Sequence, residues 1–418
     1  MIAALLKKYK NQIGDSIWSL SGLVLMNAVA QIVVFPIYAR KFGDVGYGNL
    51  QYLMAYLNVL TVSVGSAANY ARMISPTAER TENSGDYNVF LLLFSLLGVP
   101  FTYLVRIFGG APMDTATYIC YCLLFVAMAF RYYADVSYKI TLQYRRYFLY
   151  YLVIGVGYVI GAVLVWKTGI WPLGLLVGEA LGVLYAYVGS AVLRRHALRP
   201  SPAWRKTFRV ILTLFVAEGV ANLIFNVDRI LLKLVLGASA VTVYYLATLM
   251  GKTVSVVTGP LNGVLIGYLA RYEGKLTRRA MRWLTVGSFF AILLFTLLCT
   301  GGGYLALLIL YPLEFDTVKD FLLVGSLAQV IYFITSILMV VLIRFAKKSY
   351  QIFINVLFGI CFFGFGLPAT LLFGMWGFAL AMVAACAVRF AAAIALGFRW
   401  VNTHTTTHKN DPDGMITA

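Results

Sequence analysis

The chain has 418 residues, of which 61% are hydrophobic and only 12% are charged, whereas soluble proteins carry about a quarter charged residues. Its 34 basic and 16 acidic residues give a formal net charge of +18. The composition excludes an ordinary soluble globular protein. Because the basic residues lie between long apolar runs, the charge does not indicate a nucleic-acid-binding protein.

The first segment, residues 1–15, carries apolar side chains at helical spacing opposite its lysines. This pattern predicts an amphipathic helix that lies in the membrane interface and contacts membrane lipids. The apolar run that follows is too long for a signal peptide and lacks a small-residue cleavage site.

About twelve apolar runs follow, and each is long enough to cross a hydrocarbon core about 30 Å thick as a helix. They begin near Ser16, Leu50, Val89, Ala116, Phe148, Pro172, Val210, Val241, Trp283, Asp320, Tyr350 and Met375. The sequence therefore predicts an all-α polytopic membrane protein.

The basic residues are distributed unevenly between the two sets of loops. One set holds 24 basic residues, whereas the other holds only five, Arg40, Lys41, Arg106, Lys167 and Lys319. The positive-inside rule then places both termini in the cytoplasm, in agreement with an even number of spans.

A weak internal repeat appears when the sequence is shifted against itself, which aligns Gly43 with Gly237, Val62 with Val256 and Gly65 with Gly259. It predicts two six-helix bundles, residues 16–193 and 207–400, joined by a cytoplasmic linker, residues 194–206, and followed by a disordered cytoplasmic tail, residues 401–418. Two matched bundles with a cleft between them suit alternating access. Chance similarity between apolar sequences is the alternative.

Ionisable residues inside spans are costly and therefore mark candidate functional sites. In the seventh span a polar residue recurs every three or four positions, which predicts one polar stripe that lines water or ligand. The stripe consists of Glu218, Asn222, Asn226, Arg229 and Lys233. Internal salt bridges, with Lys233 extending outwards, are the alternative.

Lys252 in the eighth span has no acidic neighbour one turn away, so it needs a partner elsewhere. An anionic substrate and a carboxylate of the seventh span are the two candidates. Arg131 and Asp135 have the spacing at which two charges on one helix neutralise each other. Glu179 and Arg389 are interpreted as ties within or between bundles.

The usual parts of metal, nucleotide and serine–histidine chemistry are missing from the sequence. No histidine lies in a span, and no HExxH, CxxC, Walker or GxSxG motif is present. The five cysteines lie in apolar runs and imply no disulfide framework. We therefore expect a non-enzyme without metal or cofactor, driven by an ion gradient, the membrane potential or the substrate gradient.

Two short stretches and the whole-chain plan carry a resemblance to a known family. The stretches are IYARKFGDVGYGNL, which starts at Ile37, and NVDRILLKLVLGASAVTVYYLA, which starts at Asn226 and contains an Asp-Arg signature. The chain resembles polysaccharide or O-antigen flippases of the multidrug/oligosaccharidyl-lipid/polysaccharide exporter superfamily. The turn after Gly237 departs from this family, because it lacks the usual acidic-glycine pattern.

The resemblance implies a MATE-like fold in the plasma (inner) membrane and transport of an undecaprenyl-pyrophosphate-linked oligosaccharide from the inner to the outer leaflet. Polysaccharide polymerase machinery is the partner that this implies. Under this interpretation Lys252 and Arg229 contact the diphosphate, and Lys233 adds positive field. The candidates for contact with sugar hydroxyls are Asn58, Asn69, Asn222, Asn226 and Asn262. Glu218 and Asp228 are candidates for H⁺ or Na⁺ coupling.

Two other functions fit parts of the sequence. One is a cation-coupled drug or metabolite antiporter of the same superfamily, and the other is a membrane enzyme of polysaccharide assembly such as a polymerase. A polymerase would be expected to carry a long external loop with catalytic charges, whereas the longest outside segments here have only about ten residues.

Overall fold

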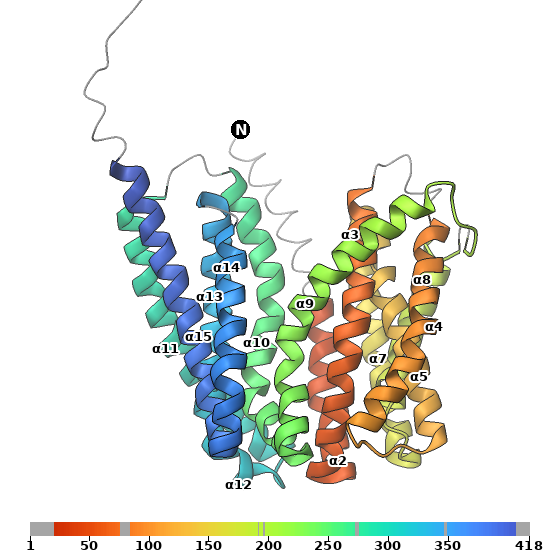
Figure 1. The fold of residues 1–418 in the computed structure, drawn as a ribbon. Coiled ribbons are helices and arrows are strands. Elements are labelled where there is room, and N and C mark those ends of the chain that lie inside the picture. Colours follow the sequence, from red (N-terminus) through yellow and green to blue (C-terminus); the bar gives the residue numbers. More distant parts are fainter. Residues whose placement is uncertain are drawn as a thin grey trace, which may run out of the picture. The chain divides into compact units, whose positions relative to one another are not determined.

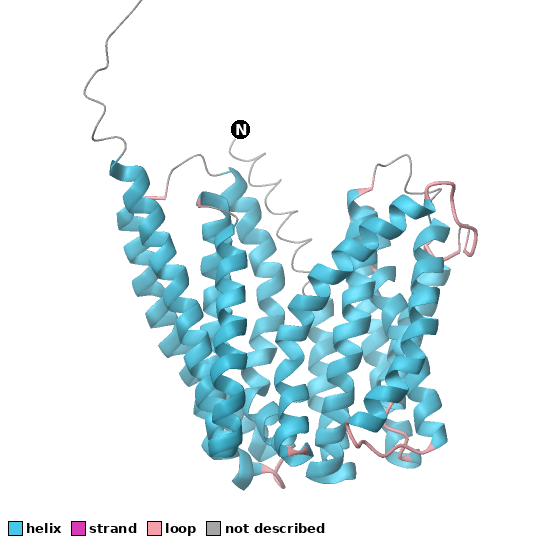
Figure 2. Ribbon diagram, in the orientation of Figure 1, coloured by secondary structure: helices cyan, strands magenta, loops and turns pink. Residues whose placement is uncertain are grey.

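The computed structural model describes residues 21–75, 84–190, 192–194, 197–271, 276–346 and 349–406, with the backbone alone in 255–271 and 404–406. The described chain consists of helices joined by short loops and contains no strand (Figure 2). It divides into two compact units, Met1–Thr242 and Val243–Ala418, called here the first and the second unit. The predicted interfacial helix, residues 1–15, lies outside the described residues.

The helices of the first unit are shown from red to green in Figure 1. They are α2 (Phe35–Leu57), α3 (Ser63–Ile74), α4 (Ser84–Phe108), α5 (Thr115–Ala134), α6 (Val136–Ile140), α7 (Tyr144–Thr168), α8 (Leu173–Gly189) and α9 (Trp204–Leu236), with π-helical turns at Ala30–Val34 and Asn58–Val62. The second unit begins within α10 (Ala238–Arg271). It continues with α11 (Arg278–Leu310), α12 (Phe315–Val318), the short 3₁₀ turn Lys319–Phe321, α13 (Leu322–Phe345), α14 (Ser349–Cys361), the π-helical turn Phe362–Gly366 and α15 (Leu367–Thr406).

Eight helical runs in the described chain are long and apolar enough to cross a membrane. Two of them, Ser21–Ile74 and Ser349–Thr403, have 54 and 55 residues, far more than the roughly 20 that one crossing needs. Each is broken by a glycine with positive φ, Gly43 in one and Gly374 in the other, and so supplies two spans. With α8 and α10 the described chain has about twelve spans, which confirms the predicted all-α membrane architecture.

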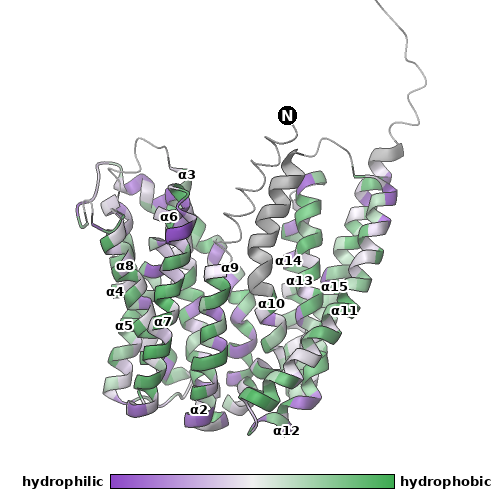
Figure 3. Cartoon of the chain, turned by 180° about the vertical axis from the view of Figure 1, so that it is seen from behind, coloured by the Kyte–Doolittle hydropathy of each residue, from purple (hydrophilic) through white to green (hydrophobic). Residues whose placement is uncertain are grey.

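Hydrophobic residues, green in Figure 3, occur along most helices. Many large ones are exposed on the surface, for example Phe290 at 66% and Leu297 at 59% on α11. In water such a surface would be an aggregation hazard, whereas in a bilayer it faces lipid. The chain is a multi-pass membrane protein.

Small residues let α7 and α8 approach each other closely. A Cβ added at Gly157 would lie 2.4 Å from Cα of Gly178, and one at Gly161 would lie 2.4 Å from the carbonyl oxygen of Leu173. Such contacts replace the hydrophobic effect as the source of helix association in lipid.

The N-terminal end of α9 is attached to α4 of the first unit by hydrogen bonds. The carboxylate of Asp86, which is fully buried, accepts hydrogen bonds from the Ser201 backbone N at 2.6 Å, from Ser201 Oγ at 2.7 Å and from Thr207 Oγ1 at 3.1 Å. The rings of Phe90 and Phe208 continue this contact, with centroids 5.0 Å apart. These contacts keep α9 with the first unit, whereas the sequence assigns residues 207–400 to the second bundle. The division into two six-helix bundles stays a prediction.

Candidate functional site

Arg229 lies in the polar stripe of α9 and is buried, with 5% of its surface exposed. Its Nη1 donates to Oε1 of Gln51 at 3.2 Å, and its Nη2 donates to Oδ1 of Asn226 at 2.5 Å. Both of these acceptors are neutral amide oxygens. Gln51 is absent from the sequence-predicted site. The signal was present, because Gln51 lies two turns before Asn58 in the same apolar run.

The stripe continues toward the N-terminal end of α9. Nδ2 of Asn226 donates to the carbonyl oxygen of Asn222 at 2.8 Å, and Nδ2 of Asn222 donates to Oγ of Ser63 on α3 at 3.1 Å. Glu218, one turn further, is half-buried. Three predicted residues, Asn222, Asn226 and Arg229, are thus joined in one chain of hydrogen bonds that also includes Gln51 and Ser63.

The other predicted residues of this region differ in burial. Asp228 is 2% exposed, and its Oδ1 accepts a hydrogen bond from the Arg229 backbone N at 2.9 Å. Lys233, in the last turn of α9, and Asn58, at the start of a π-helical turn, are half-buried. The side chain of Asn262 lies outside the described residues.

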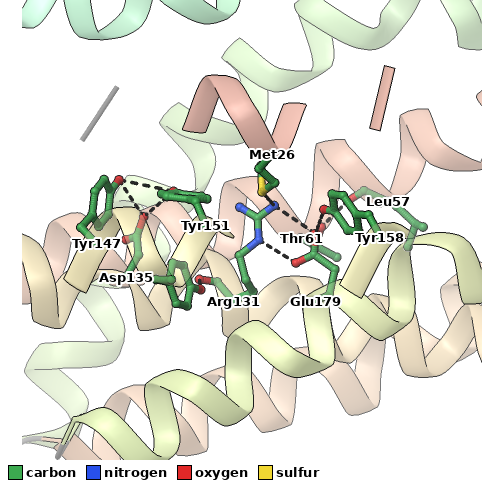
Figure 4. A network of polar contacts seen from close by, with 10 residues as sticks. Met26, Leu57, Thr61, Arg131, Asp135, Tyr147, Tyr151, Tyr158 and Glu179 are labelled. Carbon is green, nitrogen blue, oxygen red and sulfur yellow. Dashed lines mark hydrogen bonds and ion pairs between the residues drawn. The ribbon is translucent and has the colours of Figure 1, made fainter. Parts of the chain in front are cut away.

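Arg131 of α5 forms a buried ion pair with Glu179 of α8 (Figure 4). Nε donates to Oε2 at 2.6 Å and Nη2 donates to Oε1 at 3.0 Å, so the carboxylate occupies one edge of the guanidinium. Tyr158 donates to the same carboxylate at 2.5 Å, and the Tyr132 ring centroid lies 3.9 Å from Cζ of Arg131. This arrangement agrees with Glu179 as a tie within one bundle.

The prediction that Arg131 and Asp135 neutralise each other is wrong. Asp135 instead binds Lys139 at 2.9 Å, Nδ2 of Asn69 at 2.5 Å and the hydroxyl of Tyr151 at 3.0 Å. The reason is tertiary packing, because Glu179 of the neighbouring α8 takes Arg131, while donors from other helices take Asp135. Asn69 therefore belongs to the Asp135 network and is not joined by a described hydrogen bond to Arg229.

Among the described side chains of the second unit, two cations are buried, Lys252 on α10 and Arg389 on α15. They are 9% and 3% exposed. The five long helices α10, α11, α13, α14 and α15 contain no aspartate or glutamate. Lys252 is preceded by Gly251, where an added Cβ would lie 2.5 Å from Cβ of Gln329, so α10 and α13 are in close contact there.

One pair of glycines aligned by the repeat, Gly43 and Gly237, has nearly the same backbone conformation. Gly43 has φ 66° and ψ −179°, and Gly237 has φ 94° and ψ −176°. The two turns also contact each other within the first unit. The carbonyl oxygen of Asp44 accepts from Thr242 Oγ1 at 2.6 Å, and a Cβ at Gly48 would lie 1.9 Å from the carbonyl oxygen of Ala238. Both turns therefore use a backbone conformation that favours glycine, and the internal repeat stays a prediction.

No group of histidine, cysteine, aspartate and glutamate residues that could hold a metal ion is found in the described part of the chain. The cationic and amide groups described above suit binding of a polar, anionic ligand.

No protein-family model matches the sequence, and no curated protein matches it either. Solved structures do match in fold. A multidrug resistance MATE family transporter of the MOP superfamily, in an inward-facing conformation, matches with a TM-score of 0.65 at 15% identity, over 95% of this chain and 100% of that one. The lipid II flippase MurJ, in an inward closed conformation, matches with a TM-score of 0.68 at 13% identity, over 96% of this chain and 94% of that one.

A third match is the Vibrio cholerae MATE transporter VcmN in its bent form, with a TM-score of 0.55 at 14% identity, over 94% of this chain and 98% of that one. These similarities establish that the chain has the fold shared by MATE transporters and MurJ.

Proposed function

We propose that the protein is a flippase that moves an undecaprenyl-pyrophosphate-linked oligosaccharide from the inner to the outer leaflet of the plasma membrane by alternating access, with both termini in the cytoplasm. The observation that carries the proposal is the buried guanidinium of Arg229, held by amide oxygens of Gln51 and Asn226. The fold shared with a lipid II flippase and with multidrug transporters supports transport rather than catalysis.

The chemistry of the polar residues suits such a substrate. A diphosphate with attached sugars cannot cross hydrocarbon unaided, and it can replace amide oxygens as the acceptor of guanidinium and ammonium donors. In this proposal Arg229 and Lys252 bind the diphosphate and Lys233 adds positive field. The sugar hydroxyls meet the amides Asn58, Asn69, Asn222, Asn226, Asn262 and, in addition, Gln51.

Ion coupling is assigned to two carboxylates of α9. Glu218 is half-buried and Asp228 is buried, so either one can exchange a proton or bind Na⁺ as its surroundings change during transport. The carboxylates of Glu179 and Asp135 are less suited, because each is already held by a cation and by hydroxyl or amide donors. Polysaccharide polymerase machinery would take the product on the outer face.

A cation-coupled drug antiporter is the second candidate, because multidrug transporters share the fold. A cationic drug needs carboxylates or aromatic faces at its binding site. The five long helices of the second unit offer Lys252 and Arg389 and no carboxylate, which favours an anionic substrate.

Complementation with a lipid readout tests the function. In a deletion strain we expect intact single repeat units to accumulate on the undecaprenyl diphosphate of the inner leaflet while surface polymer disappears. Wild-type protein should clear them, and Lys252→Ala and Arg229→Ala should not. Arg399→Gln, an exposed change at the cytoplasmic end of α15, is the matched control. Single repeats that reach the outer face and only fail to lengthen would indicate a polymerase function instead.

A further inference from the structure

Arg389 is a buried cation near the middle of α15, between the break at Gly374 and the helix end at Thr406. Its Nη1 donates to the carbonyl oxygen of Tyr332 at 3.0 Å, and Cζ lies 3.9 Å from the centroid of the Tyr332 ring. An arginine stays charged in proteins, so its charge must be balanced by its surroundings.

The other edge of this guanidinium is poorly occupied. Nη2 has only long contacts, 3.4 Å to Oδ1 of Asn355, 3.4 Å to the sulfur of Met339 and 3.5 Å to Oγ of Ser336. Nε is buried and donates to no acceptor in the described part of the chain. An unsatisfied buried donor of a charged group is costly.

The corresponding edge of the Arg131 guanidinium binds a carboxylate. There the Nε and Nη2 donors bind the two oxygens of Glu179, at 2.6 and 3.0 Å. Both arginines also lie 3.9 Å from a tyrosine ring. The second unit thus has the guanidinium and the tyrosine ring of this arrangement, but its long helices supply no carboxylate.

We propose that the Nε–Nη2 edge of Arg389 binds an oxyanion of the phosphate class, either free or carried by a lipid. A phosphate offers two oxygens at the spacing of the guanidinium fork. Binding balances the buried charge and satisfies Nε. The site is separate from the Arg229 cluster, which lies in the first unit, and it does not depend on the proposed function.

The experiment measures ligand-dependent stability of the full chain, purified in a phosphate-free maltoside detergent. The probes are inorganic pyrophosphate and undecaprenyl diphosphate. Each is titrated while the midpoint of thermal unfolding is recorded, because a ligand that binds only the folded state raises that midpoint with its concentration. The titration is repeated in an Arg229→Ala/Lys252→Ala background, so that the residues of the proposed function do not contribute.

Two variants test the site in different ways. Arg389→Lys keeps the charge and removes the fork, and Asn355→Asp places a carboxylate beside Nη2 as an internal competitor. We expect both to weaken the affinity for the probe by about tenfold or more, while Arg399→Gln, also on α15, leaves it unchanged. Asn355→Asp should also raise the unfolding midpoint without ligand, which shows that its fold is intact.

The two probes distinguish the source of the phosphate. A response to both, lost in the two variants, supports a site for free phosphate, and a response to undecaprenyl diphosphate alone supports a lipid-borne one. If neither probe raises the midpoint, or if the variants respond as the wild type does, the site at Arg389 is rejected. The complementation result is independent of this outcome, so the two proposals fail separately.

Discussion

The two units hold a buried arginine in different surroundings. In the first unit Glu179 neutralises Arg131 through two hydrogen bonds, whereas in the second unit Arg389 contacts a tyrosine ring and neutral acceptors. Carboxylates occur in or next to the apolar helices of the first unit, at Asp86, Asp135, Glu179, Glu218 and Asp228. The long helices of the second unit have none.

The two units therefore differ in how the charge of this buried arginine is balanced. Charges in hydrocarbon persist when they are paired or when they face a ligand. The first unit pairs Arg131 internally, so that ion pair is a fixed part of its structure. The long helices of the second unit offer Arg389 no carboxylate, and the proposed oxyanion would supply the balance there.

Removal of the Glu179 carboxylate should have the largest effect on stability. Glu179→Gln leaves the Arg131 charge buried with one partner lost, and such a change typically costs about 3–5 kcal/mol. We expect a large fall in the thermal unfolding midpoint of the detergent-solubilised protein. The double variant Arg131→Met/Glu179→Leu should recover most of it, because no uncompensated charge remains.

The exposed ion pair between Asp316 and Lys319 of the second unit is the control for that measurement. The Asp316 side chain is 85% exposed, so Asp316→Asn should leave the midpoint almost unchanged. Equal effects of Glu179→Gln and Asp316→Asn would contradict the contrast between the units.

The aligned glycines should show a smaller effect, equal at the two positions. A Cβ at Gly43 or Gly237 meets no atom within 4 Å, so alanine there costs only the strain of the backbone conformation, of order 1–3 kcal/mol. Unfolding of Gly43→Ala and Gly237→Ala in a denaturant series measures this cost. Gly359→Ala, in open space within α14, is the matched control and should not destabilise. Clearly unequal losses would reject the equivalence of the two turns.

The pH dependence of two exposed loop charges, one in each unit, should show the smallest effect. In the first unit the backbone and side chain of Thr117 lower the pKa of Asp114, which caps α5, below its ordinary value of 3.8. Its stabilisation is therefore present above pH 3.8 and is lost as the pH falls through the lower, folded-state pKa.

In the second unit Asp316 raises the pKa of Lys319 above 10.5. That stabilisation is present below pH 10.5 and is lost as the pH rises through the higher, folded-state pKa. The difference in unfolding midpoint from wild type should disappear at low pH for Asp114→Asn and at high pH for Asp316→Asn. Both differences should be slight between these limits, because both sites are exposed and screened. A difference for Asp114→Asn that grew on acidification would contradict this assignment.

The sequence by itself determined the class of fold. Hydrocarbon tolerates no unpaired backbone, so runs of about twenty apolar residues must be helices, and the charges and turn residues between them mark the ends. The sequence alignment also places Gly43 opposite Gly237, and both have a backbone conformation that few residues other than glycine adopt. In the polar stripe, helical periodicity correctly placed Asn222, Asn226 and Arg229 on one face.

The partners of the polar groups were decided only by the tertiary structure. Spacing along one helix favoured Asp135 for Arg131, whereas the packing of α5 against α8 supplied Glu179. Gln51 was joined to Arg229 by contact between helices far apart in the chain. A helical period states which residues share a face, but a hydrogen bond between helices depends on their rotation and depth, which the hydrophobic pattern of a single span does not specify. For the same reason the open edge of Arg389 became apparent only when its neighbours on α13 and α14 were in place.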